Sequence, residues 1–220
     1  MGIEIKKRVI TSIFLCGILI LMYIYSFIMI ISLIIIGMIS WIEFFALIAK
    51  ILKKDNLKER FLRFLYKGVS LVYISILIYY ILIVESSYPD YKIYLFFIIL
   101  ISISTDVGGL IIGKIFKGRK LTKISPNKTI SGSVGSFLFS LSLVPLFNNI
   151  FTSYNFLELS FIVIIISFTS QLGDLFISYL KRKANVKNTS DILPGHGGVL
   201  DRIDGMIFAI PIGVLFFNLY

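Results

Sequence analysis

The sequence contains one cysteine, one histidine and one tryptophan among 220 residues. A single cysteine, Cys16, permits no disulfide within the chain. A single histidine, His196, excludes a zinc site built from several histidines. Charged residues are also scarce at 15%, whereas a soluble domain usually has about a quarter. These shortages argue against both a disulfide-supported fold and a soluble one.

Apolar residues dominate the chain instead, at 57% of the sequence, and the mean hydropathy is +0.93. Apolar runs long enough to cross a bilayer, which takes about 20 helical residues, recur along the whole length. Such runs must be helical, because lipid offers no partner to an unpaired backbone group. We therefore predict an all-α polytopic membrane protein, a single integral membrane domain over residues 1–220 with about seven transmembrane helices. The predicted spans are 9–25, 27–48, 68–84, 93–112, 133–148, 159–179 and 205–220.

The net charge of +10 would suggest nucleic acid as a partner of a soluble protein, but its distribution here indicates a membrane. With seven spans, every lysine and arginine except Lys92 falls on the same side. The positive-inside rule makes that side cytoplasmic. We therefore expect no nucleic-acid partner, a cytoplasmic N-terminus, and a location in the inner (cytoplasmic) membrane.

Residues 1–92 form the predicted N-terminal part of the domain and 93–220 its catalytic part. Within the N-terminal part, segment 50–67 alternates basic residues with apolar ones. This pattern predicts a basic amphipathic helix that lies on the membrane surface among the lipid headgroups.

Two aspartates, Asp106 and Asp174, lie inside apolar runs near the predicted cytoplasmic ends. Ionisable residues in such places are costly and usually functional. If the helix continues past Asp174, then Ser178 and Lys181 follow on the same face at i+4 and i+7. A carboxylate, a hydroxyl and an ammonium in line suggest a metal ligand and phosphate contacts. Glu43 is also within an apolar run but has no polar neighbours, which favours a structural role.

A second cluster follows Asp106. Gly109 and Gly113, four residues apart, allow another backbone to approach closely. Lys128 comes at the end of a basic loop and directly before a new helix. An ammonium ahead of a helix N-terminus suits a phosphate group.

The third cluster is residues 193–205, LPGHGGVLDRIDG. The proline and glycines predict a tight loop into the last span, and we expect the N–H groups of Gly197 and Gly198 to approach a nucleotide phosphate. If that span begins near Val199, then Asp201 and Asp204 share one helical face and can hold a hard cation such as magnesium. We expect His196 to be a positioning residue. All three clusters face the cytoplasm, and their carboxylates and cations predict phosphoryl or nucleotidyl chemistry on a lipid.

Residues 178–205, SYLKRKANVKNTSDILPGHGGVLDRIDG, resemble the C-terminal signature of phosphatidate cytidylyltransferases, also called CDP-diacylglycerol synthases. The ordered elements are a serine, Lys-Arg, a further lysine, Pro-Gly-His-Gly-Gly and Asp-Arg-x-Asp. Upstream, QLGDLFIS and GKIFKGRKLTKISPNKT are also similar to family segments, so the similarity covers about residues 102–205. In the N-terminal half, RVIT and SWIEFF are weakly similar. The chain departs from the family at Asn188, where an aspartate is usual.

The resemblance implies an enzyme, a nucleotidyltransferase that transfers CMP from CTP to phosphatidate and releases pyrophosphate, in phospholipid biosynthesis. It implies magnesium as the cofactor, CTP and phosphatidate as partners among membrane lipids, and an active site that faces the cytoplasm; a homodimer is a possible assembly. The implied catalytic residues are Asp174, Asp201, Lys181 and Lys128, with Asp174 and Asp201 as the metal ligands. The implied substrate-binding residues are Ser178, Asp106, Lys187, His196, Gly197, Gly198, Arg202 and Asp204.

Other classes of function stay open at this point. A CTP-dependent isoprenoid-lipid kinase or an ether-lipid cytidylyltransferase would use similar residues, but the intact His-Gly-Gly signature favours the phosphatidate enzyme. A secondary transporter would use Asp106 and Asp174 as an ion path. Transporters usually have repeated halves and sites near the midplane, whereas this sequence shows no internal repeat and its polar residues gather at one side.

Overall fold

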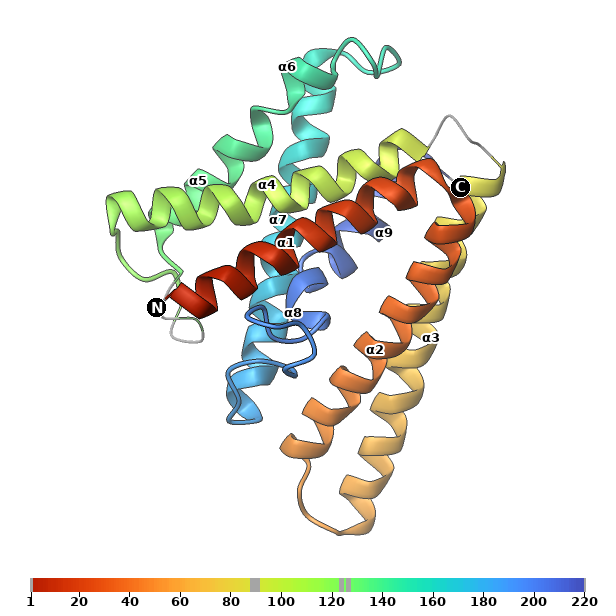
Figure 1. Ribbon diagram of the computed structural model, residues 1–220, viewed down its shortest axis with the longest axis vertical. Coiled ribbons are helices and arrows are strands. Elements are labelled where there is room, and N and C mark those ends of the chain that lie inside the picture. The colour runs from red at the N-terminus through yellow and green to blue at the C-terminus, as the bar shows by residue number, and fades with distance from the viewer. Residues whose placement is uncertain (1, 88–91, 123–124, 126–127, 220) are drawn as a thin grey trace. The chain divides into compact units, whose positions relative to one another are not determined.

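The computed structural model describes residues 2–87, 92–122, 125 and 128–219 (Figure 1). Within these ranges the regular structure is helical, and the only β-type pairings are two isolated bridges, Lys120–Thr129 and Leu193–Gly197. The predicted Ser-Pro-Asn-Lys-Thr turn lies partly outside the described residues, at positions 126 and 127.

The chain divides into two compact units. The first unit contains residues 1–92 and 180–203, and the second contains 93–179 and 204–220. Residues 180–203, which the sequence places in the catalytic part, thus pack with the N-terminal helices. The single domain over 1–220 stays a prediction.

The first unit is built from α1 (Gly2–Ile24), α2 (Ser26–Ile51), α3 (Leu57–Ser87) and the short α8 (Leu200–Ile203). The chain turns between α1 and α2 because Tyr25 has an extended conformation, with φ −117° and ψ 109°. The predicted break in the long N-terminal apolar block is therefore confirmed at this residue.

Helices α2 and α3 run side by side as a hairpin (Figure 1). Gly37 on α2 makes room for Ile78 on α3, because a Cβ at position 37 would lie 2.5 Å from the Ile78 Cδ1 atom. Nearer the turn, the Trp41 indole N–H donates to the Lys67 carbonyl over 3.1 Å. The Lys67 ammonium lies 5.2 Å from the centre of the Trp41 ring and 4.9 Å from that of Phe45, which adds cation–π attraction.

The predicted single amphipathic helix over 50–67 is wrong. Helix α2 ends at Ile51, residues 52–56 form a turn, and α3 begins at Leu57 and continues without a break to Ser87. The turn has its own polar support, since Asn56 Oδ1 accepts from the Glu59 N–H at 2.8 Å and Asp55 pairs with Arg60. These capping contacts start a new helix where the charge pattern alone suggested a continuous one.

The described helices of the second unit are, in chain order, α4 (Lys92–Phe116), α5 (Ile130–Leu141), α6 (Val144–Phe147), α7 (Phe156–Lys183) and α9 (Met206–Phe216). The first residue of α4 and residues 180–183 of α7 belong to the first unit. One end of this unit is held by an aromatic cluster in which neighbouring ring centroids lie 4.4 to 6.2 Å apart. Its members are Tyr94, Phe97, Phe147, Phe151 and Phe217. Because the rings come from α4, from α6 and the loop after it, and from the end of α9, the cluster joins distant parts of the chain.

Helices α4 and α5 meet through glycine. A Cβ at Gly108 would lie 2.5 Å from the Gly135 carbonyl oxygen, and a Cβ at Gly113 would lie 3.5 Å from the Gly132 Cα atom. The Ser136 hydroxyl donates to the Thr105 carbonyl over 2.7 Å across the same contact. A Cβ at Gly109 would lie 2.7 Å from Ser136 Oγ and 3.7 Å from the Gly132 carbonyl oxygen. The prediction that Gly109 and Gly113 admit a second backbone is therefore confirmed, and small residues of this kind are typical of helix pairs in membranes.

Among the residues that the structure describes, five helical segments are long and apolar enough to cross a membrane: Ser26–Ile51, Leu57–Glu85, Lys92–Phe116, Ile130–Phe147 and Phe156–Lys183. The chain is therefore an all-α polytopic membrane protein. The apolar part of α1, Val9–Ile24, is shorter, and α9 has only 11 residues. The count of seven spans and the cytoplasmic N-terminus stay predictions.

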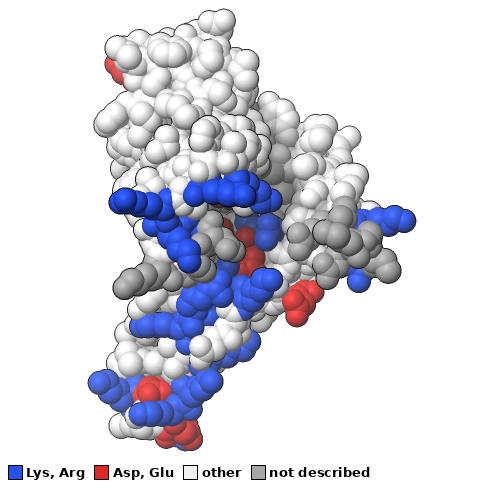
Figure 2. Space-filling model, turned by 90° about the vertical axis from the view of Figure 1, so that its left-hand side faces the viewer, with Lys and Arg blue, Asp and Glu red and all other residues white. Residues whose placement is uncertain are grey.

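Large apolar side chains lie exposed along these helices, including Phe27, Met38, Leu110 and Phe161. The space-filling view shows wide surface without charged side chains, while lysines and arginines gather in groups (Figure 2). Such a surface is unfavourable in water and favourable in lipid, as expected for helices that face a bilayer.

The close contact between α4 and α5 predicts that position 108 cannot accommodate a side chain larger than that of glycine without loss of stability. Gly108→Leu should lower the midpoint of thermal unfolding in detergent, because overpacking a tight contact costs about 1–3 kcal/mol. Gly68→Ala on α3 is the matched control, since a Cβ there meets nothing within 4 Å. An unchanged midpoint in Gly108→Leu would contradict the close approach of the two backbones.

The order of the long helices predicts the sides of their connections. If each of the five crosses once, residue 187 lies on the same side as 52–56 and 117–129, and residue 155 lies on the other side. The basic residues of these connections make the first side cytoplasmic. Reporter fusions at Lys187 and Asn155 should therefore give cytoplasmic and external signals, respectively. Signals from the same side at both positions would exclude an odd number of crossings by α7.

Candidate functional site

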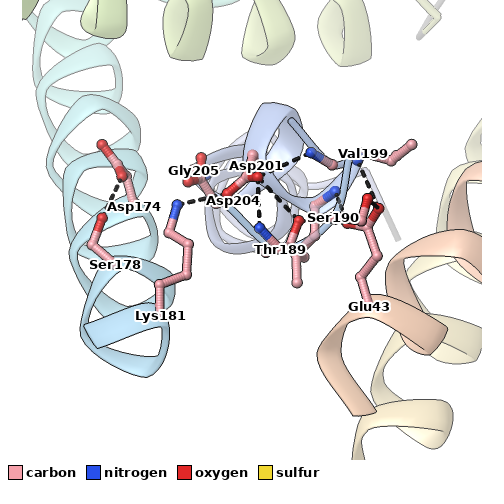
Figure 3. A network of polar contacts seen from close by, with 12 residues as sticks. Glu43, Asp174, Ser178, Lys181, Thr189, Ser190, Val199, Asp201, Asp204 and Gly205 are labelled. Carbon is pink, nitrogen blue, oxygen red and sulfur yellow. Dashed lines mark hydrogen bonds and ion pairs between the residues drawn. The ribbon is translucent and has the colours of Figure 1, made fainter. Parts of the chain in front are cut away.

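Helix α7 carries the predicted polar stripe. It is continuous through Asp174, Ser178 and Lys181, as expected from the sequence. The Ser178 hydroxyl, which is buried, donates to Asp174 Oδ1 over 3.2 Å (Figure 3). Asp174 and Ser178 are thus connected on α7, whereas Lys181 pairs with Asp201 instead.

Asp174 forms an ion pair with Lys128 within the second unit. Both side chains are about a quarter exposed. Lys128 lies just before α5, whose first turn is capped by Thr129: its hydroxyl oxygen accepts from the Gly132 N–H at 3.0 Å. The ammonium predicted to bind phosphate is therefore held at the start of a helix by a half-buried carboxylate.

The segment after α7 folds into a tight loop. The Leu193 N–H donates to the Gly197 carbonyl over 2.8 Å, and the His196 N–H donates back to the Leu193 carbonyl over 2.9 Å. Gly195 and Gly197 have φ values of 76° and 83°, a region that side chains with a Cβ disfavour. The predicted tight loop is confirmed, and its glycines are required by its backbone.

Asp201, in α8, is the centre of this loop (Figure 3). Its Oδ1 atom accepts from the Lys181 ammonium at 2.6 Å. Its Oδ2 atom accepts from the N–H groups of Thr189 at 2.9 Å and Gly198 at 3.0 Å, and lies 3.1 Å from the Thr189 hydroxyl. Burial raises the pKa of the Asp201 carboxyl, but the hydrogen bonds from Lys181, Gly198 and Thr189 outweigh it and hold that pKa below its usual range.

These contacts change the predicted role of the loop glycines. The Gly197 N–H donates to the Leu193 carbonyl over 3.1 Å, and the Gly198 N–H donates to Asp201. The chain itself therefore uses the two N–H groups that were expected to meet a phosphate. What the glycines provide is space, since a Cβ at Gly197 would lie 2.8 Å from Asp201 Oδ2 and one at Gly198 would overlap Thr189 and Glu43.

His196 contacts α1. Its Nε2 atom lies 3.2 Å from the Ser12 hydroxyl, and its Nδ1 atom is buried without a hydrogen-bond partner among the described residues. The neighbouring Thr11 hydroxyl lies 2.9 Å from the Pro194 carbonyl oxygen. Both contacts fix the tip of the loop against α1. The positioning and substrate-binding role of His196 stays a prediction.

Glu43 is the residue that sequence reasoning assigned only a general structural role. It lies in α2 with 3% of its surface exposed, and it accepts hydrogen bonds from the loop at Thr189, Ser190, Val199 and Leu200. The one sequence signal was a lone carboxylate within an apolar run. Its partners could not be identified, because they lie 146 to 157 residues further along the chain.

Asp201 and Asp204 do not share a helix face. Helix α8 ends at Ile203, and Asp204 lies in the turn that follows, where its own carboxylate accepts from the Gly205 N–H at 2.9 Å. The prediction of a continuous helix from Val199 is wrong, because this turn separates α8 from α9. Lys187, Arg202 and Asp106 are exposed, and their substrate-binding roles stay predictions.

No group of three or more histidine, cysteine, aspartate or glutamate side chains gathers for a metal ion in the described part of the chain. Asp174 and Asp201, the predicted metal ligands, belong to different compact units. Each carboxylate is paired with a lysine, Asp174 with Lys128 and Asp201 with Lys181.

The lowered pKa of Asp201 predicts that the folded protein becomes less stable in acid. A carboxylate whose pKa is lower in the folded state stabilises the fold above its unfolded pKa of about 3.8 and loses this effect as pH falls through the folded value. Thermal unfolding of wild type should therefore shift to lower temperature as the pH approaches and passes below this range. Asp201→Asn should show a lower midpoint at neutral pH and a smaller loss in acid.

Asp191→Asn is the matched control, because Asp191 is an exposed aspartate in the same loop. It should follow the wild-type curve. If the unfolding midpoints of wild type and Asp201→Asn changed with pH in parallel, the Asp201 contacts would not contribute to the pH dependence of stability.

Comparison with known proteins gives the family. The model of the cytidylyltransferase family matches residues 4–220. A phosphatidate cytidylyltransferase of Staphylococcus saprophyticus is 40% identical over 147 residues, which cover 66% of this chain and 55% of that protein. Proteins of the same name from Bacillus subtilis and Rickettsia bellii are 37% and 44% identical over 142 and 148 residues, covering 64% and 62% of this chain and 53% and 62% of theirs.

The chain thus spans about half the length of the curated relatives it matches. The family match covers the described helices from residue 4 of α1 onward and both lysine–aspartate pairs. The suspected resemblance is confirmed, and the chain belongs to the cytidylyltransferase family.

Proposed function

We propose that the protein transfers CMP from CTP to phosphatidate, which yields CDP-diacylglycerol and pyrophosphate, and that it does so at the cytoplasmic side of the inner membrane. The name of its relatives supports this substrate pair. The structural observation that carries the proposal is the presence of two lysines, Lys128 and Lys181, each held by a carboxylate in a chain whose long helices suit a bilayer.

The reaction mainly requires that two polyanions be brought together. A phosphatidate phosphate is already an anion near neutral pH, so one of its oxygens can attack the α-phosphorus of CTP without a general base. The new bond joins this oxygen to phosphorus, and the bond from phosphorus to the bridging oxygen of the β-phosphate breaks. Pyrophosphate leaves with that electron pair, so the site must stabilise negative charge on both sides.

Lys128 and Lys181 are suited to this task. Each ammonium has three donor hydrogens, and the contacts with Asp174 and Asp201 leave donors for phosphate oxygens. The carboxylates orient the ammonium groups before substrate binds, so little side-chain entropy is lost on binding. Arg202, which is exposed and next to Asp201, is a third cation for the nucleotide phosphates.

Magnesium is the proposed cofactor, with Asp174 and Asp201 as its ligands. Carboxylate oxygens are the donors that this hard cation prefers. Asp174 fits best, because Ser178 and Lys128 leave part of its acceptor capacity free. Asp201 already accepts from Lys181, Thr189 and Gly198, so it has fewer free acceptor positions than Asp174, and its Oδ1 atom, which accepts only from Lys181, keeps the most capacity. When bound, magnesium would neutralise phosphate charge as a Lewis acid.

The test uses the purified full-length protein in detergent with phosphatidate, magnesium and CTP labelled at its α-phosphate. We expect label in CDP-diacylglycerol and an equal amount of pyrophosphate. Transfer of label from γ-labelled CTP to a lipid alcohol would instead identify a kinase, and the absence of lipid product would contradict the proposal.

Two variants test the site within the same assay. Asp174→Asn and Lys128→Gln should each reduce turnover by about a hundredfold or more, because they remove a charge used in the transition state. Lys183→Gln, at the exposed end of α7, is the matched lysine control and should keep wild-type turnover. Near-normal turnover in Asp174→Asn would show that this carboxylate neither binds magnesium nor orients Lys128.

A further inference from the structure

Glu43 is a buried carboxylate that the proposed chemistry does not use. It lies in the apolar sequence SWIEFF on α2, and only 3% of its surface is exposed. Burying an ionised carboxylate is unfavourable unless hydrogen bonds replace its water. Its surroundings should therefore contain donors, and the fold must bring them from elsewhere in the chain.

Four donors meet this carboxylate, all from residues 189–200. The Oε1 atom accepts from the Ser190 hydroxyl at 2.6 Å and the Val199 N–H at 3.1 Å. The Oε2 atom accepts from the Thr189 hydroxyl at 2.7 Å and the Leu200 N–H at 2.8 Å. We call residues 189–200 the signature loop. Glu43 thus holds both ends of this loop, the residues that enter it and the residues that leave it for α8 (Figure 3).

Thr189 connects Glu43 with Asp201. Its hydroxyl has one hydrogen and lies nearer to Glu43, at 2.7 Å, than to Asp201, at 3.1 Å. Its backbone N–H donates to Asp201 over 2.9 Å. Thr189 therefore donates its hydroxyl to one carboxylate and its amide to the other, so that a shift of Glu43 would be transmitted to the carboxylate that holds Lys181.

The fit around Glu43 leaves no room for adjustment. A Cβ on Gly198 would overlap both the Thr189 hydroxyl and the Glu43 carboxylate. A glutamine at position 43 would keep the length of the side chain, but its amide nitrogen could not accept from the backbone N–H of Val199 or Leu200 that it would face. Only a carboxylate at this position accepts from all four.

We propose that Glu43 is a positioning residue for the CMP transfer: it fixes the backbone of the signature loop and, through Thr189, the Asp201–Lys181 pair. This role rests on the proposed function. Through Glu43, helix α2, which lies outside the main signature, would help to position the Asp201–Lys181 pair.

The first test compares Glu43→Gln with Ser40→Ala in the cytidylyltransferase assay. Ser40 is a matched control, since it is 1% exposed, lies one turn before Glu43 on α2, and donates to the Ile36 carbonyl of its own helix. Glu43→Gln should lower kcat by about a hundredfold with a smaller change in the KM for CTP, because misplacement of groups that stabilise the transition state acts on turnover. Ser40→Ala should behave as wild type.

The second measurement does not depend on activity. Amide hydrogen exchange in the full-length protein should become faster at Val199 and Leu200 in Glu43→Gln, with unchanged exchange in α3. Wild-type exchange together with wild-type kcat in Glu43→Gln would overturn the proposal. Faster exchange with wild-type kcat would also overturn it, since the anchor would then have no effect on the reaction.

A pair of variants at Thr189 decides the question even if Glu43→Gln does not fold. Thr189→Val removes the hydroxyl and should lower kcat, whereas Thr189→Ser keeps it and should restore kcat. Equal, wild-type kcat in both would overturn the link to Asp201. If wild type itself forms no CDP-diacylglycerol, the proposed function fails, while hydrogen exchange still tests the anchoring of the loop by Glu43.

Discussion

The buried carboxylate of Glu43 imposes a requirement that the rest of the first unit must meet. An ionised group removed from water has to recover its hydrogen bonds from the protein. The four hydrogen bonds described for Glu43 do not come from α2, whose backbone N–H groups bond within the helix and whose nearby Ser40 hydroxyl donates to the Ile36 carbonyl. The loop over 189–200 supplies all four, and in return its backbone is fixed at both ends. The need of the Glu43 carboxylate for hydrogen bonds thus accounts both for the conformation of residues 189–200 and for their packing against α2.

Asp201, which directly follows this loop, is surrounded by hydrogen-bond donors in a similar way. It too is a carboxylate surrounded by donors, but one of them is the Lys181 ammonium rather than a backbone group. An anchored carboxylate that orients a lysine is a preorganised site for an anion, since the lysine does not have to be ordered when the ligand arrives. The Lys128–Asp174 pair in the second unit has the same form. This repeated form is the structural support for the proposed chemistry on phosphates.

Glycine serves helix packing at some positions and the conformation or spacing of a loop at others. In the second unit, Gly108 and Gly135 let α4 and α5 approach until backbone meets backbone, which is a common way for helices to associate where water cannot drive them together. In the first unit, Gly195 and Gly197 permit a backbone conformation and Gly198 leaves space for two side chains. The sequence shows glycines in both places, but only their surroundings distinguish a packing role from a conformational one.

The sequence by itself determined that the chain is helical and polytopic, because each apolar run must pair its own backbone groups in lipid, and it determined the order of Asp174, Ser178 and Lys181, because helical spacing is local. It also revealed the family, through a long ordered signature. Only the tertiary structure decided what these residues contact. The donors of Gly197 and Gly198 turned out to serve the chain itself, and the break after Ile203 separated Asp201 from Asp204. Glu43 found its partners about 150 residues away, and such contacts arise from packing between distant segments, which no local pattern records.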